Sequence, residues 1–218
     1  MMKVAIIGAN GKVGSKLGRI LAENGDEPIG FIRKAEQAKQ LEAQGIQTVI
    51  ADLIETDIEE FTRLLKACDA VVFTAGAGGA GDELTTAIDG EGLVKVAKAA
   101  EMADVRRFLL VSAFPDAGRG KDMPASFEHY MKIKRQSEVD LVKTALDWTI
   151  LRPGTLTDDA GNGKVNLGYT LMYDTIARED VAAVLVELLN YPETAGQILE
   201  VVQGDEPIAS AVKIKAGK

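Results

Sequence analysis

The chain has 218 residues, a length that suits one α/β domain with a large buried core. Lys and Arg total 25 and Asp and Glu total 33, so the formal net charge of −8 disfavours a general nucleic-acid binder and docking onto anionic membrane lipid. One cysteine and one histidine exclude an internal disulfide and disfavour a metal site, and without a visible signal peptide or a membrane-length apolar run we expect a cytoplasmic protein with small-molecule partners.

The first predicted strand, Val4–Ile7, ends at a glycine turn and leads directly into an amphipathic helix. The glycines Gly8, Gly11 and Gly14 follow a G-x-x-G-x-x-G spacing. Glycines let the backbone approach a ligand, and a helix start offers unpaired N–H groups at the positive end of the helix dipole. The arrangement predicts a pyrophosphate site, with an ordinary strand-to-helix turn as the alternative.

Short β-branched segments alternate with longer helical patterns along the rest of the chain. This alternation predicts a three-layer Rossmann fold of the α/β class, a doubly wound and mainly parallel sheet with helices on both faces, in one domain over residues 1–218. We expect a ligand at the carboxyl ends of the strands. The further strands are predicted at residues 28–32, 46–50, 70–73, 107–111, 148–151 and 197–202, and the further helices at 35–43, 58–67, 82–102, 126–144, 179–189 and 206–212.

Three stretches are too rich in glycine, proline or polar residues for regular structure, namely 74–81, 113–124 and 158–163. Little chain follows the sixth predicted strand, so mainly residues 113–124 and 155–177 remain to surround a substrate. We therefore expect a small C-terminal substrate region and a partly open pocket. A nucleotide sugar is too large for so little cover.

The end of the second predicted strand indicates which dinucleotide the site prefers. NAD-binding versions of this layout place an acidic residue there to hold the ribose 2′-hydroxyl, whereas this strand is followed by Arg33 and Lys34. Because arginine pairs well with a 2′-phosphate, we expect NADP (NADPH) to be favoured over NAD. A solvated, charged helix start is the alternative interpretation. Asp52, after the third strand, either accepts a hydrogen bond from the adenine amino group or caps the following turn.

Three further residues form a candidate catalytic group. Ser112 ends the fifth predicted strand, and Tyr130 and Lys134 are four residues apart on a predicted helix, so they share one face. A Tyr-x-x-x-Lys pattern occurs often by chance. It becomes informative when a serine ends the preceding strand and a dinucleotide loop begins the chain.

With these residues the sequence resembles the short-chain dehydrogenase/reductase superfamily, especially its atypical and extended branch of small bacterial NAD(P)-binding epimerase/dehydratase-like and NmrA-like proteins. The matching motifs occur in the family's order from residue 3 to about 182. They are Gly8-Ala9-Asn10-Gly11-Lys12-Val13-Gly14, Asp52-Leu53, Val72-Phe73-Thr74-Ala75-Gly76, Asp89-Gly90-Glu91-Gly92, Arg107 to Ala113, Tyr130 to Lys134, Leu151-Arg152-Pro153-Gly154 and Glu179-Asp180-Val181-Ala182.

The resemblance implies roles for the candidate catalytic residues and for the cofactor contacts. Tyr130 is the expected general acid/base, with its pKa lowered by the ammonium of Lys134 and the positive nicotinamide. Lys134 also holds the nicotinamide ribose, and Ser112 orients the substrate oxygen. The expected cofactor contacts, with Arg33 and Lys34, are Gly8, Asn10, Gly11, Lys12, Val13, Gly14, Asp52, Leu53, Thr74, Ala75, Gly76 and Pro153.

The resemblance implies an enzyme, an NADP-dependent oxidoreductase that transfers hydride to a small carbonyl, quinone or flavin-like acceptor. Two alternatives stay open, a non-catalytic NADP(H)-binding redox-sensing regulator of the NmrA-like type and a sugar epimerase/dehydratase-like enzyme. Retention of Ser112, Tyr130 and Lys134 favours the reductase, and the short substrate region favours the regulator. We expect a monomer or a homodimer.

Overall fold

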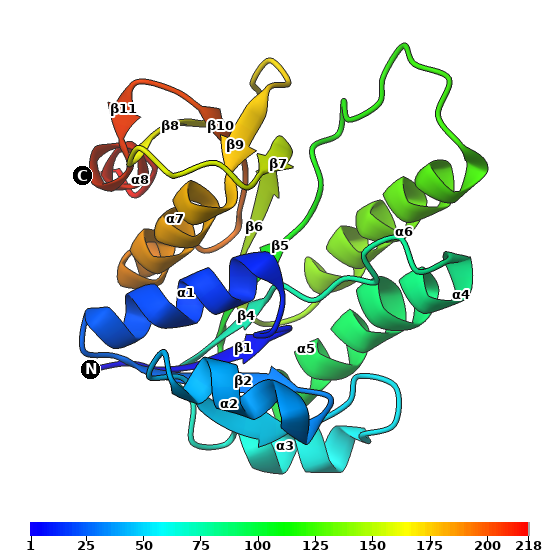
Figure 1. Cartoon of the computed structure of the whole chain (residues 1–218), viewed down its shortest axis with the longest axis vertical. Helices are drawn as coiled ribbons and strands as arrows, with labels where there is room; N and C mark the ends of the chain where they lie inside the picture. The colour runs from blue at the N-terminus through cyan, green and yellow to red at the C-terminus, as the bar shows by residue number, and fades with distance from the viewer. Residues whose placement is uncertain (218) are drawn as a thin grey trace.

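A central sheet of nine strands dominates the computed structural model, which describes residues 1–217 (Figure 1). Its strand order is β11-β8-β10-β6-β5-β4-β1-β2-β3. The strands span Lys3–Ile7 (β1), Glu27–Ile32 (β2), Gln47–Ile50 (β3), Ala70–Phe73 (β4), Arg107–Val111 (β5), Asp147–Pro153 (β6), Lys164–Gly168 (β8), Gln197–Gln203 (β10) and Glu206–Pro207 (β11). The strands β7 (Thr155–Thr157) and β9 (Thr175–Ala177) pair with each other in a separate two-stranded sheet.

Helices cover both faces of the central sheet (Figure 1). They span Lys12–Glu23 (α1), Ala38–Glu42 (α2), Ile58–Leu65 (α3), Asp82–Thr85 (α4), Gly92–Met102 (α5), Ala125–Leu141 (α6), Arg178–Asn190 (α7) and Ile208–Lys215 (α8). Shorter 3₁₀ turns lie at Ala35–Gln37 and Pro192–Thr194. Helices α1 and α7 pack together on one face, with α8 against α7, while α3, α5 and α6 pack on the other.

Strand β1 is covered by helices on both faces, which explains why its residues from Val4 to Ile7 are all apolar rather than alternately apolar and polar. Val4 and Ile6 point into the core beneath α1 and α7, and Ala5 and Ile7 point into the core beneath α3 and α5. All four are buried, because side chains alternate across a strand that is covered on both faces.

The strand order reverses between β1 and β4, which are neighbours in the sheet. Along the sheet, the neighbouring strands β3, β2, β1, β4, β5, β6 and β10 all run parallel. Of the described strands in this sheet, only β8 runs in the opposite direction, antiparallel to both β10 and β11. The predicted doubly wound α/β fold is therefore confirmed. Its reversal point places the ends of β1, β2, β4 and β5 around one crevice, where such sheets bind ligands.

The predicted helix at 82–102 is helical throughout but changes type in its middle. A π-helical turn, Thr86–Glu91, separates α4 from α5. Within this turn the Asp89 carboxylate accepts a hydrogen bond from the Ala77 N–H at 2.8 Å, and the Asp89 carbonyl accepts one from the Ser137 hydroxyl at 2.6 Å. Such π turns often occur at functional sites, and this one directs a carboxylate towards the sheet edge.

The last predicted helix, at 206–212, is wrong in its position. Glu206–Pro207 forms β11 and pairs with β8, and the helix begins only at Ile208 and ends at Lys215. A residue before proline is pushed out of the helical region, so Glu206 stays extended and the helix starts after Pro207.

No helix within residues 1–217 is long and apolar enough to cross a membrane. Nor do the described side chains include a group of three or more His, Cys, Asp or Glu residues that could hold a metal ion.

Candidate functional site

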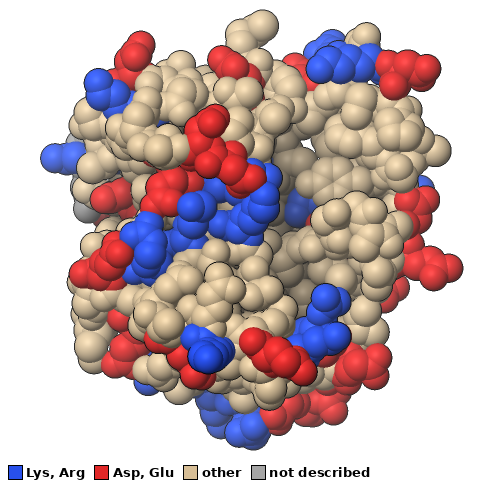
Figure 2. All heavy atoms as spheres, viewed as in Figure 1, with Lys and Arg blue, Asp and Glu red and all other residues tan. Residues whose placement is uncertain are grey.

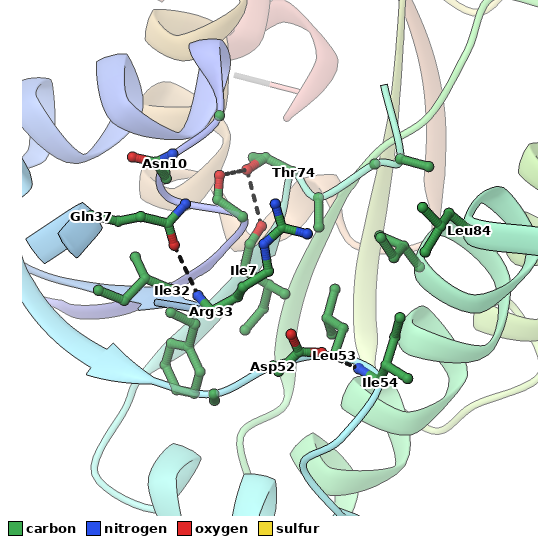
Figure 3. Close-up of a pocket in the computed structure, with 18 of the residues that line it drawn as sticks. Ile7, Asn10, Ile32, Arg33, Gln37, Asp52, Leu53, Ile54, Thr74 and Leu84 are labelled. Carbon is green, nitrogen blue, oxygen red and sulfur yellow. Dashed lines mark hydrogen bonds between the residues drawn. The ribbon is translucent and has the colours of Figure 1, made fainter. Parts of the chain in front are cut away.

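Two adjoining cavities follow the carboxyl ends of the strands at the reversal point. The smaller, drawn in Figure 3, has a volume of about 340 Å³ and lies over the ends of β1 and β2. The larger, of about 670 Å³, lies between α1, α4 and α6. Gly11 and the segment 74–76 line both cavities, so the two form one continuous groove. An elongated groove of this kind suits a ligand with two connected parts.

The glycine loop after β1 is tightly packed against the end of β4. Gly8 has a φ of +88°, and a Cβ at this position would lie 2.6 Å from the Ala75 Cα. A Cβ on Gly14 would lie 2.5 Å from the Gly8 carbonyl oxygen. The Thr74 hydroxyl donates to the Ile7 carbonyl at 3.0 Å and fixes the two loops to each other. Side chains at Gly8 and Gly14 would separate these loops.

Helix α1 begins at this loop without a side-chain cap. Its N-cap is Gly11, which has no side chain to satisfy the N–H groups of the first turn. Lys12 and Val13 from this turn line the larger cavity, and Asn10 lines the smaller one. Uncapped N–H groups beside a cavity fit the pyrophosphate of a dinucleotide.

The smaller cavity contains Arg33, one of the two residues predicted to select the dinucleotide. In Figure 3 the Arg33 side chain extends from the end of β2 towards Thr74, across the cavity that it lines. Gln37 lines the same cavity, and its amide oxygen accepts hydrogen bonds from the N–H groups of Arg33 and Lys34 at 3.1 Å. Lys34 is exposed and is not among the described residues that line either cavity.

Asp52 and Leu53 line the smaller cavity from the loop after β3. The Asp52 carboxylate accepts a hydrogen bond from the Ile54 N–H at 2.8 Å, so it caps the turn. Lys95 on α5 holds the same loop, because its ammonium donates to the carbonyls of Leu53 at 2.8 Å, Ile54 at 3.0 Å and Thr56 at 2.8 Å.

Ser112, Tyr130 and Lys134 all line the larger cavity, as the predicted catalytic group requires. Ser112 is 5% exposed, and its hydroxyl has no hydrogen-bond partner within residues 1–217. Lys134 is also buried, and its ammonium donates to the Val111 carbonyl at 2.9 Å. A buried hydroxyl without a partner is costly, which points to a polar ligand atom at this position.

Asp89 is a site residue to which the sequence interpretation gave no role. It is 2% exposed, lines the larger cavity and lies 3.6 Å from the Lys134 ammonium. Its other carboxylate oxygen holds the Ala77 N–H at 2.8 Å. Asp89 therefore connects α6, which carries Lys134, to the loop that follows β4.

The electrostatics around Tyr130 differ from the expectation that Lys134 lowers its pKa. Burial and the negative charge of Asp89 raise the pKa of Tyr130 to about 12. Burial also lowers the pKa of Lys134, although the charge of Asp89 opposes this effect. Tyr130 is therefore a neutral phenol at physiological pH, the form that can donate a proton.

Pro153 does not line either cavity in the described part of the chain. It is buried at the end of β6, where it pairs with Val201 of β10. The neighbouring Arg152 turns towards α6 and forms a two-point ion pair with Glu138, with distances of 2.9 and 2.5 Å.

The two segments predicted to surround a substrate touch each other. The Phe114 ring packs edge-on against the Tyr173 ring, with centroids 5.2 Å apart. The Tyr173 hydroxyl shares a 2.7 Å hydrogen bond with the Thr155 hydroxyl. From these segments and the start of α6, Pro124, Phe127 and Leu156 contribute apolar surface to the larger cavity.

The sequence interpretation also missed Arg178, which lines the larger cavity. It is the first residue of α7, where a cation is unfavourable beside the positive end of the helix dipole. That unfavourable position is a signal that the sequence offers. Asp89 lies in a motif that matches the family, which was the available signal, whereas Phe127 and Leu156 carry none, because only the tertiary packing brings them to the cavity.

Comparisons with known proteins agree with this geometry. A family model described as NAD(P)H-binding matches residues 8–192. A relative from Bacillus subtilis (strain 168), described as the uncharacterized sugar epimerase YhfK, is 37% identical over 214 residues, which cover 97% of this chain and 99% of the relative.

Two solved structures extend the comparison. One from Bacillus halodurans, described as a candidate NAD-dependent epimerase/dehydratase, matches with a TM-score of 0.89 at 36% identity and covers 98% of this chain and 100% of its own. The anaerobillin reductase ChuY from Escherichia coli O157:H7 matches with a TM-score of 0.80 at 25% identity and covers 93% of this chain and 98% of its own.

Proposed function

The chain belongs to the NAD(P)H-binding family, within the short-chain dehydrogenase/reductase superfamily, and from this premise we propose that it is an NADPH-dependent reductase of a small conjugated carbonyl, quinone or flavin-like acceptor. The smaller cavity would hold the adenine half of the cofactor, and the larger one, which Ser112 and Tyr130 line, would hold the nicotinamide half. Gly11 and the segment 74–76 lie where the two halves join.

The unpartnered hydroxyl of Ser112 is the observation that carries this proposal. It is buried in the wall of the larger cavity, where an acceptor oxygen would provide the missing hydrogen-bond partner. Tyr130 and Lys134 line the same cavity, so the phenol of Tyr130 lies in the same site as an acceptor oxygen bound by Ser112.

Each residue then has a distinct task in the reduction. Ser112 donates a hydrogen bond to the acceptor oxygen and orients it. Tyr130, held neutral by burial and by Asp89, donates a proton to that oxygen. Lys134 is fixed by the Val111 carbonyl and Asp89, and its ammonium would hold the hydroxyls of the nicotinamide ribose. When bound, the reduced nicotinamide supplies the hydride.

The lining of the larger cavity favours a flat, conjugated acceptor. Phe127 and Tyr130 place their ring centroids 6.2 Å apart, and Pro124 and Leu156 add apolar surface. Aromatic side chains bind planar ligands through offset or edge contacts. The description of the Escherichia coli relative as an anaerobillin reductase is consistent with an acceptor of this class.

The position of Arg33 supports the preference for NADPH. We expect Arg33→Ala to weaken NADPH binding by about 10-fold to 100-fold, as the loss of a charge-assisted phosphate contact does, and to leave NADH binding almost unchanged. Lys34→Ala is the matched control, because Lys34 carries the same charge but does not line the cavity within the described chain. Equal affinities of the wild type for NADPH and NADH in a calorimetric titration would contradict the preference.

The catalytic proposal is tested with Tyr130→Phe. We expect this variant to bind NADPH like the wild type and to oxidise it at least about 100-fold more slowly with the acceptor that the wild type uses, because a general acid contributes a factor of this order. A panel of quinones, flavins and conjugated carbonyls identifies that acceptor. Tight NADPH binding without oxidation by any acceptor would instead favour a redox-sensing regulator.

A further inference from the structure

A single carboxylate joins two cations at the edge of the larger cavity. One oxygen of Asp158 accepts a hydrogen bond from the Lys12 ammonium at 2.5 Å, and the other accepts one from the Arg178 guanidinium at 2.7 Å. The three residues come from distant parts of the chain, at the start of α1, after β7 and at the start of α7. Asp158 is well exposed, so burial does not force this arrangement.

Both cations occupy positions that are electrostatically unfavourable within their own helices. Lys12 is the first residue of α1 and Arg178 is the first residue of α7, where the helix dipole is positive. Neither helix has a side-chain cap that satisfies its first N–H groups. The first turn of α7 also carries the acids Glu179 and Asp180, so the cations Lys12 and Arg178, which meet at Asp158, are what make this a site for an anion.

The location of this site relative to the groove identifies the anion. Lys12 and Arg178 both line the larger cavity, together with Gly11 and Val13 of the glycine loop. Figure 2 shows Lys and Arg side chains gathered beside the hollow of this face, with Asp and Glu next to them. The site therefore lies at the glycine loop, where the proposed function places the phosphates of the dinucleotide.

We propose that Lys12 and Arg178 together bind a phosphate of the dinucleotide and so form a phosphate clamp. The carboxylate of Asp158, which belongs to the chain itself, occupies this clamp until the cofactor displaces it. The inference rests on the proposed binding of NADPH and adds two residues to it, Arg178 as a ligand and Asp158 as a competitor. The two oxygens of Asp158 contact the cations in the way that two oxygens of a phosphate do.

Displacement of Asp158 also connects the cofactor to the substrate region. Asp158 follows β7, and Leu156 of this strand lines the larger cavity. Release of the carboxylate frees Asp158 from Lys12 and Arg178, while Asp180 of α7 continues to hold the Gly163 N–H at 2.9 Å. One end of this segment, at Asp158, thus has contacts that depend on the cofactor, and the other end, at residues 162–163, is held by Asp180 in either case.

The test compares binding of NADPH, ADP-ribose and adenosine to four single variants by calorimetry. Asp158→Asn is expected to increase the affinity for NADPH and for ADP-ribose by about fivefold, because the ion pairs of Asp158 with Lys12 and Arg178 no longer compete with the phosphate. Arg178→Gln is expected to weaken both by about tenfold. Adenosine, which has no phosphate, should bind equally to all forms. Asp159→Asn and Lys16→Gln are the matched controls, because neither residue lines the larger cavity within the described chain.

The outcomes separate the clamp from the proposed function. If Asp158→Asn and the control Asp159→Asn bind NADPH with the same affinity, the clamp is overturned and the reductase proposal stays intact. A gain for NADPH that does not extend to ADP-ribose would place the anion site at the 2′-phosphate or on the nicotinamide side, away from the pyrophosphate, and would also overturn the clamp. Failure of the wild type and of every variant to bind either nucleotide would overturn the proposed function and the clamp together.

Discussion

At the scale of single residues, Asp89 sets the charge around the proposed proton donor. Its carboxylate raises the pKa of Tyr130 together with burial, and it pairs with Lys134. We expect Asp89→Asn to lower the pKa of Tyr130, because the variant removes a negative charge that opposes the phenolate. Titration of tyrosinate absorbance in the protein without cofactor measures this change, and Tyr130→Phe identifies the step that belongs to Tyr130.

The same pKa has a consequence for stability at high pH. The native phenol keeps its proton up to about pH 12, whereas an unfolded tyrosine loses it near pH 10. The free energy of unfolding contributed by Tyr130 therefore falls as the pH rises through this interval. Because Asp89→Asn should lower the native pKa of Tyr130, it should narrow the pH interval between the pKa values of the native and the unfolded protein. An unchanged Tyr130 titration in Asp89→Asn would mean that burial alone sets the pKa.

Arg107 is a second buried charge, and its role is structural. Its guanidinium donates to the Asp147 carbonyl at 3.0 Å, the Thr149 hydroxyl at 2.8 Å, the Leu188 carbonyl at 2.7 Å and the Thr194 hydroxyl at 2.9 Å. Burial lowers its pKa to about 10.

We expect Arg107→Met to reduce the free energy of unfolding by about 2–4 kcal/mol, because several buried acceptors lose their donor. Urea denaturation measures the change. The adjacent Arg106 is the matched control, since it forms an exposed pair with Asp147 and its replacement by Met should cost less than about 1 kcal/mol. Equal losses of unfolding free energy in the two variants would show that the buried hydrogen bonds of Arg107 stabilise the protein no more than the exposed pair of Arg106 does.

At the scale of elements, α5 supports the adenine end of the site from outside it. The Lys95 ammonium holds three carbonyls of the loop that contains Leu53, and three is the number of donors that an ammonium has. We expect Lys95→Met to weaken binding of NADPH and adenosine by about threefold to tenfold through loss of loop order.

Lys98→Met is the matched control for Lys95→Met. Lys98 lies on the same helix and forms an exposed pair with Glu101 at 3.5 Å. Hydrogen exchange of the amides at 53–56 should become faster only in Lys95→Met. Nucleotide affinities that match in the two variants would contradict the supporting role of Lys95.

The elements that the sequence predicts best are those with a local physical signal. Buried runs separated by helical patterns predict the parallel sheet, and the glycine spacing predicts the turn at Gly8. Ser112, Tyr130 and Lys134 are predicted to meet because their strand end and helix face lie at one sheet edge, and they line one cavity. Asp89 and Asp158 could not be predicted in this way, since a π turn and contacts between distant loops position them.

At the scale of the whole molecule, the groove joins the smaller cavity, proposed for the adenine half of the dinucleotide, to the larger cavity, proposed for the nicotinamide and the acceptor. The two cavities share Gly11 and the loop after β4, and the segments around Phe114 and Tyr173 close against each other beyond the larger one. In the proposed function, this arrangement would leave room for a compact, planar acceptor beside a cofactor that is held at both ends. It is the arrangement that a reductase needs and that a passive nucleotide sensor does not require.

The central claim is that this groove delivers a hydride from NADPH to an acceptor that receives its proton from Tyr130. The most direct measurement uses NADPH deuterated at the transferable position, with mass spectrometry of the product. We expect the wild type to place the deuterium in the product and Tyr130→Phe to do so about 100-fold more slowly at unchanged NADPH affinity. Tight NADPH binding without label in any product of the acceptor panel would contradict the claim, and so would equal rates in the two proteins.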